Sequence, residues 1–180
     1  MLQELIVSLM VSISPAEAAA IDKSIAGHLA DESYCLAENV YHEARNQPKV
    51  GQMAVMSVTL NRVNDPRYPN TICGVTKQGP TRPSWQDETV MIHIKHKCQF
   101  SWYCDGKSDR IHDMETFNSI YLFTTGLVDG TMILKDVTEG ATHYHADYVS
   151  PDWAKTKTKT IEIEDHIFYR WETARLIFFT

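Results

Sequence analysis

Two predicted helices joined by a short turn, residues 35–63, constrain the fold of this chain more than any other stretch. The first helix is indicated by apolar residues at helical spacing after a good N-cap: Leu36, Val40 and Tyr41 after Ser33. Pro48 disfavours helical geometry in the residue before it, so the turn is predicted at residues 46–48. The second helix is apolar on most faces, through Val50, Met53, Ala54, Val55, Met56, Val58 and Leu60. We therefore expect the second helix at the centre of the domain.

Glu43 stands at the end of the first predicted helix, beside the apolar second one. Partial burial there would raise the pKa of its carboxyl group, because desolvation disfavours the charged form. A carboxyl group with a raised pKa suits a general acid that works near neutral pH. The alternative is that Arg45 or His42 neutralises Glu43, which would then be only structural.

Five sequence blocks, in order along the chain, carry a resemblance to a known family. They are YHEARNQPKVGQMAVMSVTLNRV (41–63), PNTICGV (69–75), CQFSWYCDG (98–106), GATHYHADYVSPDWA (140–154) and HIFYR (166–170). Together they resemble the SleB-type cell wall hydrolases, known from spore cortex-lytic enzymes and from related bacterial and phage proteins. The resemblance implies a mainly α-helical α+β fold, lysozyme-like with a small β-element.

The resemblance also implies an enzyme that cleaves the β-1,4 bond between N-acetylmuramic acid and N-acetylglucosamine, with Glu43 as catalytic acid. One acid is sufficient for a lytic transglycosylase, which forms a 1,6-anhydromuramic end, whereas most glycosidases need two carboxylates. Two alternatives stay open: a hydrolytic muramidase in which Asp105, Asp147 or another carboxylate activates water, and a non-catalytic wall-binding protein of the same fold. Asn46 and Gln47 stand where the family has Gly-Glu, so the local turn is left undetermined.

Aromatic and polar side chains together suit a saccharide groove, since aromatic faces stack on sugar rings and polar neighbours fix their orientation. In the family the FSW and HYH segments line the cleft, which implies that Ser101, Trp102 and Tyr144 do so here. The full set of predicted substrate-binding residues is Tyr41, Asn61, Gln99, Phe100, Ser101, Trp102, Tyr144 and Trp153. The residues alone favour a core role for the Phe and Trp members, and Asn61 is either a groove residue or a structural one.

His143, His145 and Asp147 form an H-x-H-x-D pattern, which on a strand would place three metal ligands on one face. His42 or His166 would complete such a site. The pattern matches no metalloprotease signature, because no second histidine follows the His-Glu pair at residues 42–43 with the H-E-x-x-H spacing. We therefore expect neither a metal nor a cofactor.

The composition is that of one globular domain: 180 residues, 43% of them hydrophobic and 22% charged. The formal net charge of −6 argues against non-specific nucleic-acid binding, which relies on a basic surface. It gives no help in approaching anionic wall polymers either, so recognition must come from a shaped groove. We expect a monomer that binds peptidoglycan glycan strands, without stable membrane insertion or nucleic acid. Its place would be the cell wall or periplasm, after export or phage-mediated release.

The N-terminal segment, residues 1–32, is predicted to be helical and to precede a catalytic domain at residues 33–180. Residues 2–13 are apolar but too short to span a bilayer. They are either the apolar part of an export signal, cleaved at Ala16-Glu17-Ala18, or part of a retained segment. Retention is favoured, because Ser14 to Glu17 read as a capping box with Pro15 at the first helical position. That helix is predicted to end at about residue 30.

Four cysteines allow two disulfides or four reduced, buried thiols: Cys35, Cys73, Cys98 and Cys104. A local bridge between Cys98 and Cys104 is expected if the protein works outside the cytoplasm. Their spacing is not that of a zinc ribbon, because the sequence has no C-x2-C pair.

The remaining segments are predicted from turn residues and periodicity. Loops are expected at 64–70 and 78–84, one helical turn at 71–75 and an extended segment at 99–103, while 90–94 is open between helix and strand. Asp113 should cap a helix that Gly130 ends, with one apolar side made of Met114, Phe117, Tyr121 and Val128. Extended structure is expected at 141–148, 161–163 and 167–169, a short helix or turn at 150–153 and a solvated segment at 155–159.

Overall fold

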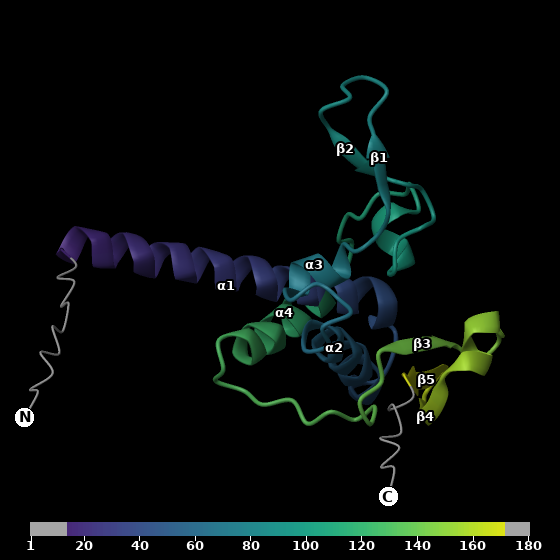
Figure 1. The fold of residues 1–180 in the computed structure, drawn as a ribbon. Helices are drawn as coiled ribbons and strands as arrows, with labels where there is room; N and C mark the ends of the chain where they lie inside the picture. Colours follow the sequence, from purple (N-terminus) through teal and green to yellow (C-terminus); the bar gives the residue numbers. More distant parts are fainter. Residues whose placement is uncertain (1–13, 172–180) are drawn as a thin grey trace, which may run out of the picture.

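In the computed structural model, which describes residues 14–171, helices form one side of the molecule and a small antiparallel sheet the other (Figure 1). The helices are α1 (Pro15–Ala44), α2 (Lys49–Val63), α3 (Ile72–Thr76) and α4 (Met114–Val128), with short 3-10 helices η1 (Ser101–Cys104) and η2 (Asp152–Thr156). The sheet has the order β3-β5-β4, built from β3 (His143–Ala146), β4 (Thr158–Ile163) and β5 (His166–Arg170). A separate hairpin pairs β1 (Thr81–Pro83) with β2 (Met91–His93).

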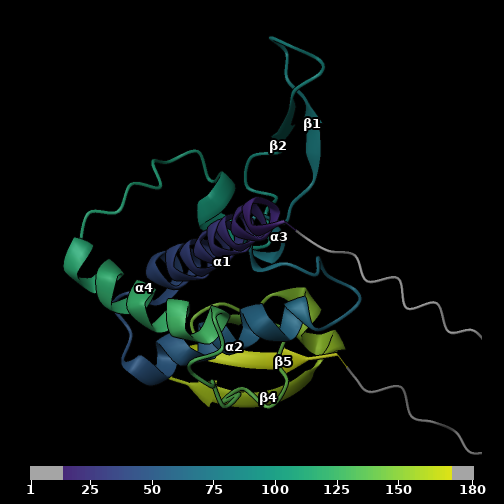
Figure 2. The same ribbon diagram turned by 90° about the vertical axis from the view of Figure 1, so that its left-hand side faces the viewer.

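The second helix of the pair, α2, lies between two parts of the core, as its apolar composition predicts. Val55 belongs to the same buried cluster as Leu36 of α1 and Ile120 of α4. Val58, on another face of α2, belongs to a cluster with Phe168 of β5. Figure 2 shows α2 between the helices α1 and α4 and the strands β4 and β5. The predicted central position of this helix is confirmed.

The first helix is longer than predicted. Instead of one helix to about residue 30 and another after Ser33, the chain forms a single helix of 30 residues, α1. The Ser33 hydroxyl donates a hydrogen bond of 2.7 Å to the Leu29 carbonyl one turn earlier, so it is not an N-cap. No proline follows Pro15 until Pro48, and this permits the continuity. The predicted start at Pro15 is confirmed, whereas the export-signal region at 2–13 lies outside the described residues.

Two disulfides tie the helices and loops together. Cys35–Cys73 joins α1 to α3, and Cys98–Cys104 closes the predicted local loop around η1. The Glu32 carboxylate reinforces the first connection, because it accepts a hydrogen bond of 2.5 Å from the backbone N–H of Ile72 at the start of α3. The alternative of four reduced thiols is wrong for this structure.

Most of the remaining elements follow the predictions. Asp113 caps α4 by accepting a hydrogen bond of 3.0 Å from the Thr116 N–H, and Gly130 beyond its end has φ of 80°. The short helix α3, the strands β3 to β5 and the short helix η2 lie at or next to their predicted positions. Among the described residues, no helix is both long and apolar enough to cross a membrane.

Three local predictions are wrong or incomplete. Residues 101–104, expected to be extended, form η1, because the disulfide draws the two ends of this loop together. The predicted loop at 78–84 contains β1, and its partner β2 resolves the open assignment of 90–94 as strand. Residues 155–159 are not simply a solvated segment, since the Lys157 ammonium lies 3.6 Å from the ring centre of Trp171.

Candidate functional site

Three elements that are distant in the sequence meet around Glu43. This residue occupies the last turn of α1, Arg62 the last turn of α2, and Tyr144 lies on β3. The Tyr144 hydroxyl donates a hydrogen bond of 2.7 Å to Oε2 of Glu43. Glu43 is partly exposed, so its carboxyl group is neither sealed in the core nor turned fully into solvent.

Opposing effects act on the charge state of Glu43. Burial raises the pKa of its carboxyl group, while the hydrogen bond from Tyr144 and the positive charge of Arg62 lower it, and burial has the largest effect. Burial and the neighbouring carboxylate also hold the pKa of Tyr144 well above its usual value. Tyr144 therefore stays protonated and acts as a donor to Glu43. A carboxyl group under such opposing effects can both give and take a proton.

Arg62 is a buried cation that sequence reasoning missed. Its side chain is 4% exposed, and its Nε donates a hydrogen bond of 2.7 Å to the Thr142 carbonyl. The guanidinium carbon lies 4.9 Å from the ring centre of Phe100 and 5.4 Å from that of Tyr68. Its Nη1 has no hydrogen-bond partner among the described residues. The signal was present in the sequence as the Arg of the NRV block, of which only the Asn was considered.

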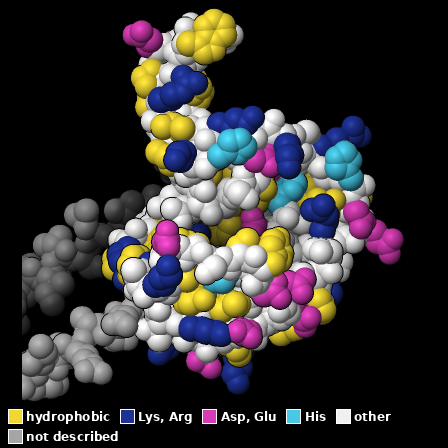
Figure 3. Space-filling model, turned by 90° about the vertical axis from the view of Figure 1, so that its right-hand side faces the viewer, with side chains coloured by type: hydrophobic (Ala, Val, Ile, Leu, Met, Phe, Trp, Pro, Cys, Tyr) yellow, Lys and Arg dark blue, Asp and Glu magenta, His cyan; other side chains and the backbone are white. Residues whose placement is uncertain are grey.

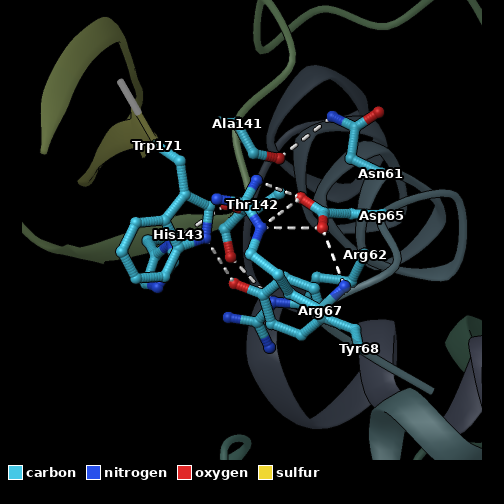
Figure 4. A network of polar contacts seen from close by, with 9 residues as sticks. All are labelled: Asn61, Arg62, Asp65, Arg67, Tyr68, Ala141, Thr142, His143 and Trp171. Carbon is cyan, nitrogen blue, oxygen red and sulfur yellow. Dashed lines mark hydrogen bonds and ion pairs between the residues drawn. The ribbon is translucent and has the colours of Figure 1, made fainter. Parts of the chain in front are cut away.

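The end of α2 also fixes the segment that leads into β3 (Figure 4). Nδ2 of Asn61 donates hydrogen bonds to the Ala141 carbonyl (3.0 Å) and to Asp136 (3.1 Å), next to the bond from Arg62 to Thr142. These contacts hold residues 136–142 against α2. Because Tyr144 follows two residues later, they set the position of the hydroxyl that reaches Glu43. Asn61 thus makes structural hydrogen bonds, which is one of the two roles that the sequence left open.

Trp102 of η1 is anchored to the last two turns of α1. Its Nε1 donates a hydrogen bond of 2.9 Å to Oδ1 of Asn39, and its ring stacks on His42 with centres 4.6 Å apart. Asn39 is itself held by Thr59 of α2, to which it donates a hydrogen bond of 3.2 Å. Burial lowers the pKa of His42, which favours a neutral ring on the Trp102 face. The loop that carries η1 is therefore fixed one turn away from Glu43.

The surface between these two anchored segments is hollowed. Figure 3 views the molecule from the side of the sheet and the hairpin, and it shows a depression between the hairpin side above and the sheet side below. Acidic and histidine side chains are visible in the depression, and hydrophobic side chains border it. A depression that combines hydrophobic borders with a few polar groups is the arrangement expected of a binding site.

The structure separates the predicted groove residues into two groups. Gln99 and Ser101 are exposed, and Tyr144 contacts Glu43. Tyr41, Phe100 and Trp102 are buried at 3%, 2% and 8% exposure, so they support the site from within the core.

Tyr41 and Trp153 have protein partners of their own. The Tyr41 hydroxyl accepts hydrogen bonds of 3.2 and 3.0 Å from the backbone N–H groups of His112 and Asp113. Trp153, half-buried on η2, packs against His143 and His145, with ring centres 5.4 and 5.6 Å away. Trp153 keeps partial exposure, whereas Tyr41 does not.

The H-x-H-x-D pattern is used for packing. His143 and His145 share one face of β3 and both contact Trp153, while Asp147 falls in the turn after the strand. Burial, followed by the nearby cations Arg62, Lys157 and Arg67, lowers the pKa of His143 to about 3. Within residues 14–171, no group of three His, Cys, Asp or Glu side chains is arranged to hold a metal ion.

Comparison with known sequences identifies similar proteins. A family model described as Cell Wall Hydrolase matches residues 46–169. A spore cortex-lytic enzyme of Halalkalibacterium halodurans is 28% identical over 144 residues, which make up 79% of this chain and 36% of that protein. The spore cortex-lytic enzyme of Bacillus subtilis is 52% identical over 40 residues, 22% of this chain and 13% of that protein. The matched regions thus span well under half of the relatives' length.

Two solved structures share the fold. The catalytic domain of the Bacillus cereus SleB protein matches with a TM-score of 0.53 and 27% identity, over 77% of this chain and 89% of that one. The catalytic domain of the germination-specific lytic transglycosylase SleB from Bacillus anthracis matches with a TM-score of 0.54 and 27% identity, over 77% and 93% of the two chains. The predicted fold class, a mainly helical, lysozyme-like α+β domain, is confirmed.

Proposed function

Since the chain belongs to the cell wall hydrolase family, we propose that it is a lytic transglycosylase that cleaves peptidoglycan glycan strands with Glu43 as its single acid and base. The bond is the β-1,4 linkage between N-acetylmuramic acid and N-acetylglucosamine, and the place of action is the cell wall or periplasm. The family match begins at residue 46, after Glu43, so the role of Glu43 is supported by the geometry of the site. The single observation that carries it is the partly exposed carboxyl group held at 2.7 Å by the Tyr144 hydroxyl.

In the first step, protonated Glu43 gives its proton to the glycosidic oxygen. The bond from that oxygen to C1 of the muramic sugar breaks, and the N-acetylglucosamine hydroxyl leaves. Burial supports this step because it raises the pKa of the carboxyl group and so keeps the acid protonated to higher pH. Tyr144 fixes the direction of the carboxyl group through its hydrogen bond.

In the second step, the Glu43 carboxylate takes the proton of the muramic C6 hydroxyl. The C6 oxygen bonds to C1 and closes the 1,6-anhydro ring, so no water is consumed and Glu43 returns to its protonated form. The carboxylate formed between the two steps is stabilised by the Arg62 charge and the Tyr144 hydrogen bond. Both groups favour the charged form and so oppose the effect of burial.

The surroundings of Glu43 favour one acid over two. Arg62 is the charged side chain that acts on the pKa of Glu43, and no second carboxylate among the described residues does so. Asp105 is occupied by the backbone N–H of Lys107, which donates a hydrogen bond of 2.7 Å to it, and Asp147 is exposed beyond β3. We propose Gln99, Ser101, Tyr144 and Trp153 as the side chains that contact the glycan, with Tyr41, Phe100 and Trp102 shaping the groove from behind.

The test compares Glu43→Gln with wild type on purified sacculi, with soluble products identified by mass spectrometry. We expect at least about a hundredfold loss of product release, the usual size of a general-acid contribution. Glu38→Gln is the matched control, because Glu38 lies on the same helix and burial also raises the pKa of its carboxyl group. Glu38→Gln should keep wild-type activity.

Product chemistry decides the reaction type. Anhydromuramic ends are expected, whereas reducing ends would show hydrolysis by a muramidase. Equal release by Glu43→Gln and wild type would exclude Glu43 as the acid, and absence of cleavage by wild type would favour a wall-binding protein.

A further inference from the structure

The β1–β2 hairpin forms an arm, residues 81–93, that rises from the body of the molecule (Figure 1). Its connecting loop carries Trp85, which is 80% exposed, and Val90 and Met91 nearby are 48% and 55% exposed. Exposing a large indole to water is unfavourable, because burying an aromatic side chain of this size stabilises a protein by a few kcal/mol. An indole exposed in this way is available to stack against a bound ligand, which would shield it from water.

The arm is fixed to the segment that carries η1. The backbone N–H of Ile94 donates a hydrogen bond of 2.9 Å to the Pro80 carbonyl, and the N–H of Gln99 donates one of 2.9 Å to the Gln78 carbonyl. Gly79 lies so close to Cys98 that a Cβ at this position would come within 2.9 Å of the Cys98 sulfur. The Cys98–Cys104 disulfide then links this base to η1.

The same unit is tied to the catalytic end of α1. His93 of the arm packs against Tyr103 of η1, with ring centres 5.0 Å apart. The neighbouring Trp102 is held by Asn39 and His42 of α1, as described above. The arm therefore has a defined position relative to Glu43, and Figure 3 shows it rising beside the hollow on the same face.

We propose that the arm is a second glycan contact, in which Trp85 stacks on a sugar ring of the strand whose cleaved bond lies at Glu43. This inference rests on the proposed function. A strand advances about 3.3 Å per residue, so Trp85 stands up to roughly 13 Å beyond Thr81 at the base. The arm contacts the polymer away from the cleaved bond, which makes it a determinant of binding to long strands.

The charges and size of the arm favour a glycan over other ligands. The residues around Trp85 are hydroxyl, amide and acidic side chains, which can hydrogen-bond to sugar hydroxyls: Ser84, Gln86, Asp87, Glu88 and Thr89. Asp87 and Glu88 at the tip give no attraction to anionic lipid headgroups, whereas stacking of an indole on a sugar ring needs no charge. A stable protein interface buries about 800 Å² on each partner, far more than one indole with two smaller neighbours offers.

The test measures co-sedimentation with purified sacculi in the Glu43→Gln background, where cleavage does not destroy the ligand. Adding Trp85→Ala should weaken binding about three- to tenfold, the range for loss of one aromatic stacking contact. Ile133→Ala is the matched control: Ile133 is 94% exposed, follows α4 and lies far along the chain from the arm. Its binding should equal that of the parent. Thermal melting of each variant reports whether the fold is intact.

A second measurement uses the otherwise wild-type enzyme. Trp85→Ala should lower the rate of cleavage more on sacculi than on a soluble tetrasaccharide fragment. Equal binding of sacculi with and without Trp85 would overturn the arm contact alone. The same comparison is made with vesicles of phosphatidylethanolamine and phosphatidylglycerol. If Trp85→Ala reduced binding to the vesicles but not to sacculi, the arm would be a membrane contact and the proposed glycan contact would be overturned. Cleavage by Glu43→Gln would overturn the proposed function, and the role of Trp85 would then be decided by repeating the sedimentation comparison on ice, before the sacculi are degraded.

Discussion

Glu43 and Tyr144 form a pair in which only one member changes its charge. Burial and the nearby carboxylate keep the pKa of Tyr144 far above neutral pH, so its hydroxyl remains a donor. Its hydrogen bond to Glu43 stabilises the charged carboxylate and thereby lowers the pKa that burial raises. Tyr144 thus fixes the Glu43 carboxyl group and also tunes its pKa.

Replacing Tyr144 with Phe removes the hydrogen bond that lowers the pKa of Glu43, while burial, which raises it, remains. The pKa of Glu43 should therefore rise. The acid form would then persist to higher pH, so the alkaline limb of the pH profile of kcat/KM should move upward. At neutral pH we expect roughly a tenfold loss in kcat, since a hydrogen bond to a charged group is worth about 1.5 kcal/mol or more. Rates of anhydromuramic product formation across pH measure both effects.

Tyr169→Phe is the matched control for this prediction. The Tyr169 hydroxyl lies 3.0 Å from Nε2 of His145 and, like that of Tyr144, belongs to the sheet, but it does not contact Glu43. Its removal should leave the position of the alkaline limb unchanged. A downward movement of the limb in Tyr144→Phe would contradict the assigned role.

At the scale of elements, the two disulfides have different functions. Cys35–Cys73 connects two helices over a sequence separation of 38 and has the larger effect on the unfolded chain. Cys98–Cys104 closes a separation of only 6, but it joins the base of the arm to η1 beside the site. We therefore expect the first to contribute mainly to stability and the second mainly to the geometry of the proposed groove.

Replacing each pair with serine should separate these contributions. The chain-entropy estimate gives a loss of about 4 kcal/mol in the free energy of unfolding for Cys35/Cys73 and about 2 kcal/mol for Cys98/Cys104. Urea denaturation measures this order. Cleavage of sacculi at a temperature where both variants remain folded should show the larger loss for Cys98/Cys104→Ser.

The reverse order of activities would show that the groove does not depend on the local bridge. Reduction of the wild-type protein with dithiothreitol is a further check, because it should reproduce the loss of activity seen in the Cys98/Cys104 variant. Unchanged activity after complete reduction would contradict the role of that bridge.

At the scale of the whole molecule, the site costs stability. The folded state raises the pKa of Glu43 above its unfolded value, so the folded protein holds this proton more tightly than the unfolded chain. The corresponding stability is fully present below the unfolded pKa and is lost as pH rises through the folded pKa. Above the raised pKa the desolvated carboxylate therefore destabilises the fold.

Glu43→Gln should consequently be more stable than wild type above the raised pKa, by roughly 1 kcal/mol. The difference should shrink as the pH falls below the pKa of an ordinary carboxyl group. Residue 43 is then neutral in both proteins, in the folded and in the unfolded state. Urea denaturation at several pH values measures the difference.

Glu88→Gln serves as the control, because it makes the same chemical change on the exposed arm. The difference in the free energy of unfolding between Glu88→Gln and wild type should not grow with pH. A stability difference between Glu43→Gln and wild type that does not grow in favour of Glu43→Gln as pH rises would contradict the argument from burial.

Patterns within one element were predictable from the sequence. The apolar faces of α2, the Asp113 cap of α4 and the Cys98–Cys104 bridge depend on residues a few positions apart, and the structure confirms each. The break proposed at Ser33 failed because a serine inside a helix can bond to its own backbone as well as cap an end. The extended form predicted for η1 failed because a covalent bridge overrides the strand propensity of its aromatic residues.

The sequence by itself determined which helix lies at the centre and to which family the chain belongs, and it indicated Glu43 as the candidate acid. Only the tertiary structure decided the partners of that acid. The bond from Tyr144 to Glu43 joins residues 101 positions apart, and the one from Arg62 to Thr142 joins residues 80 positions apart. Local periodicity carries no information about contacts of this range, because they depend on how whole elements pack against each other.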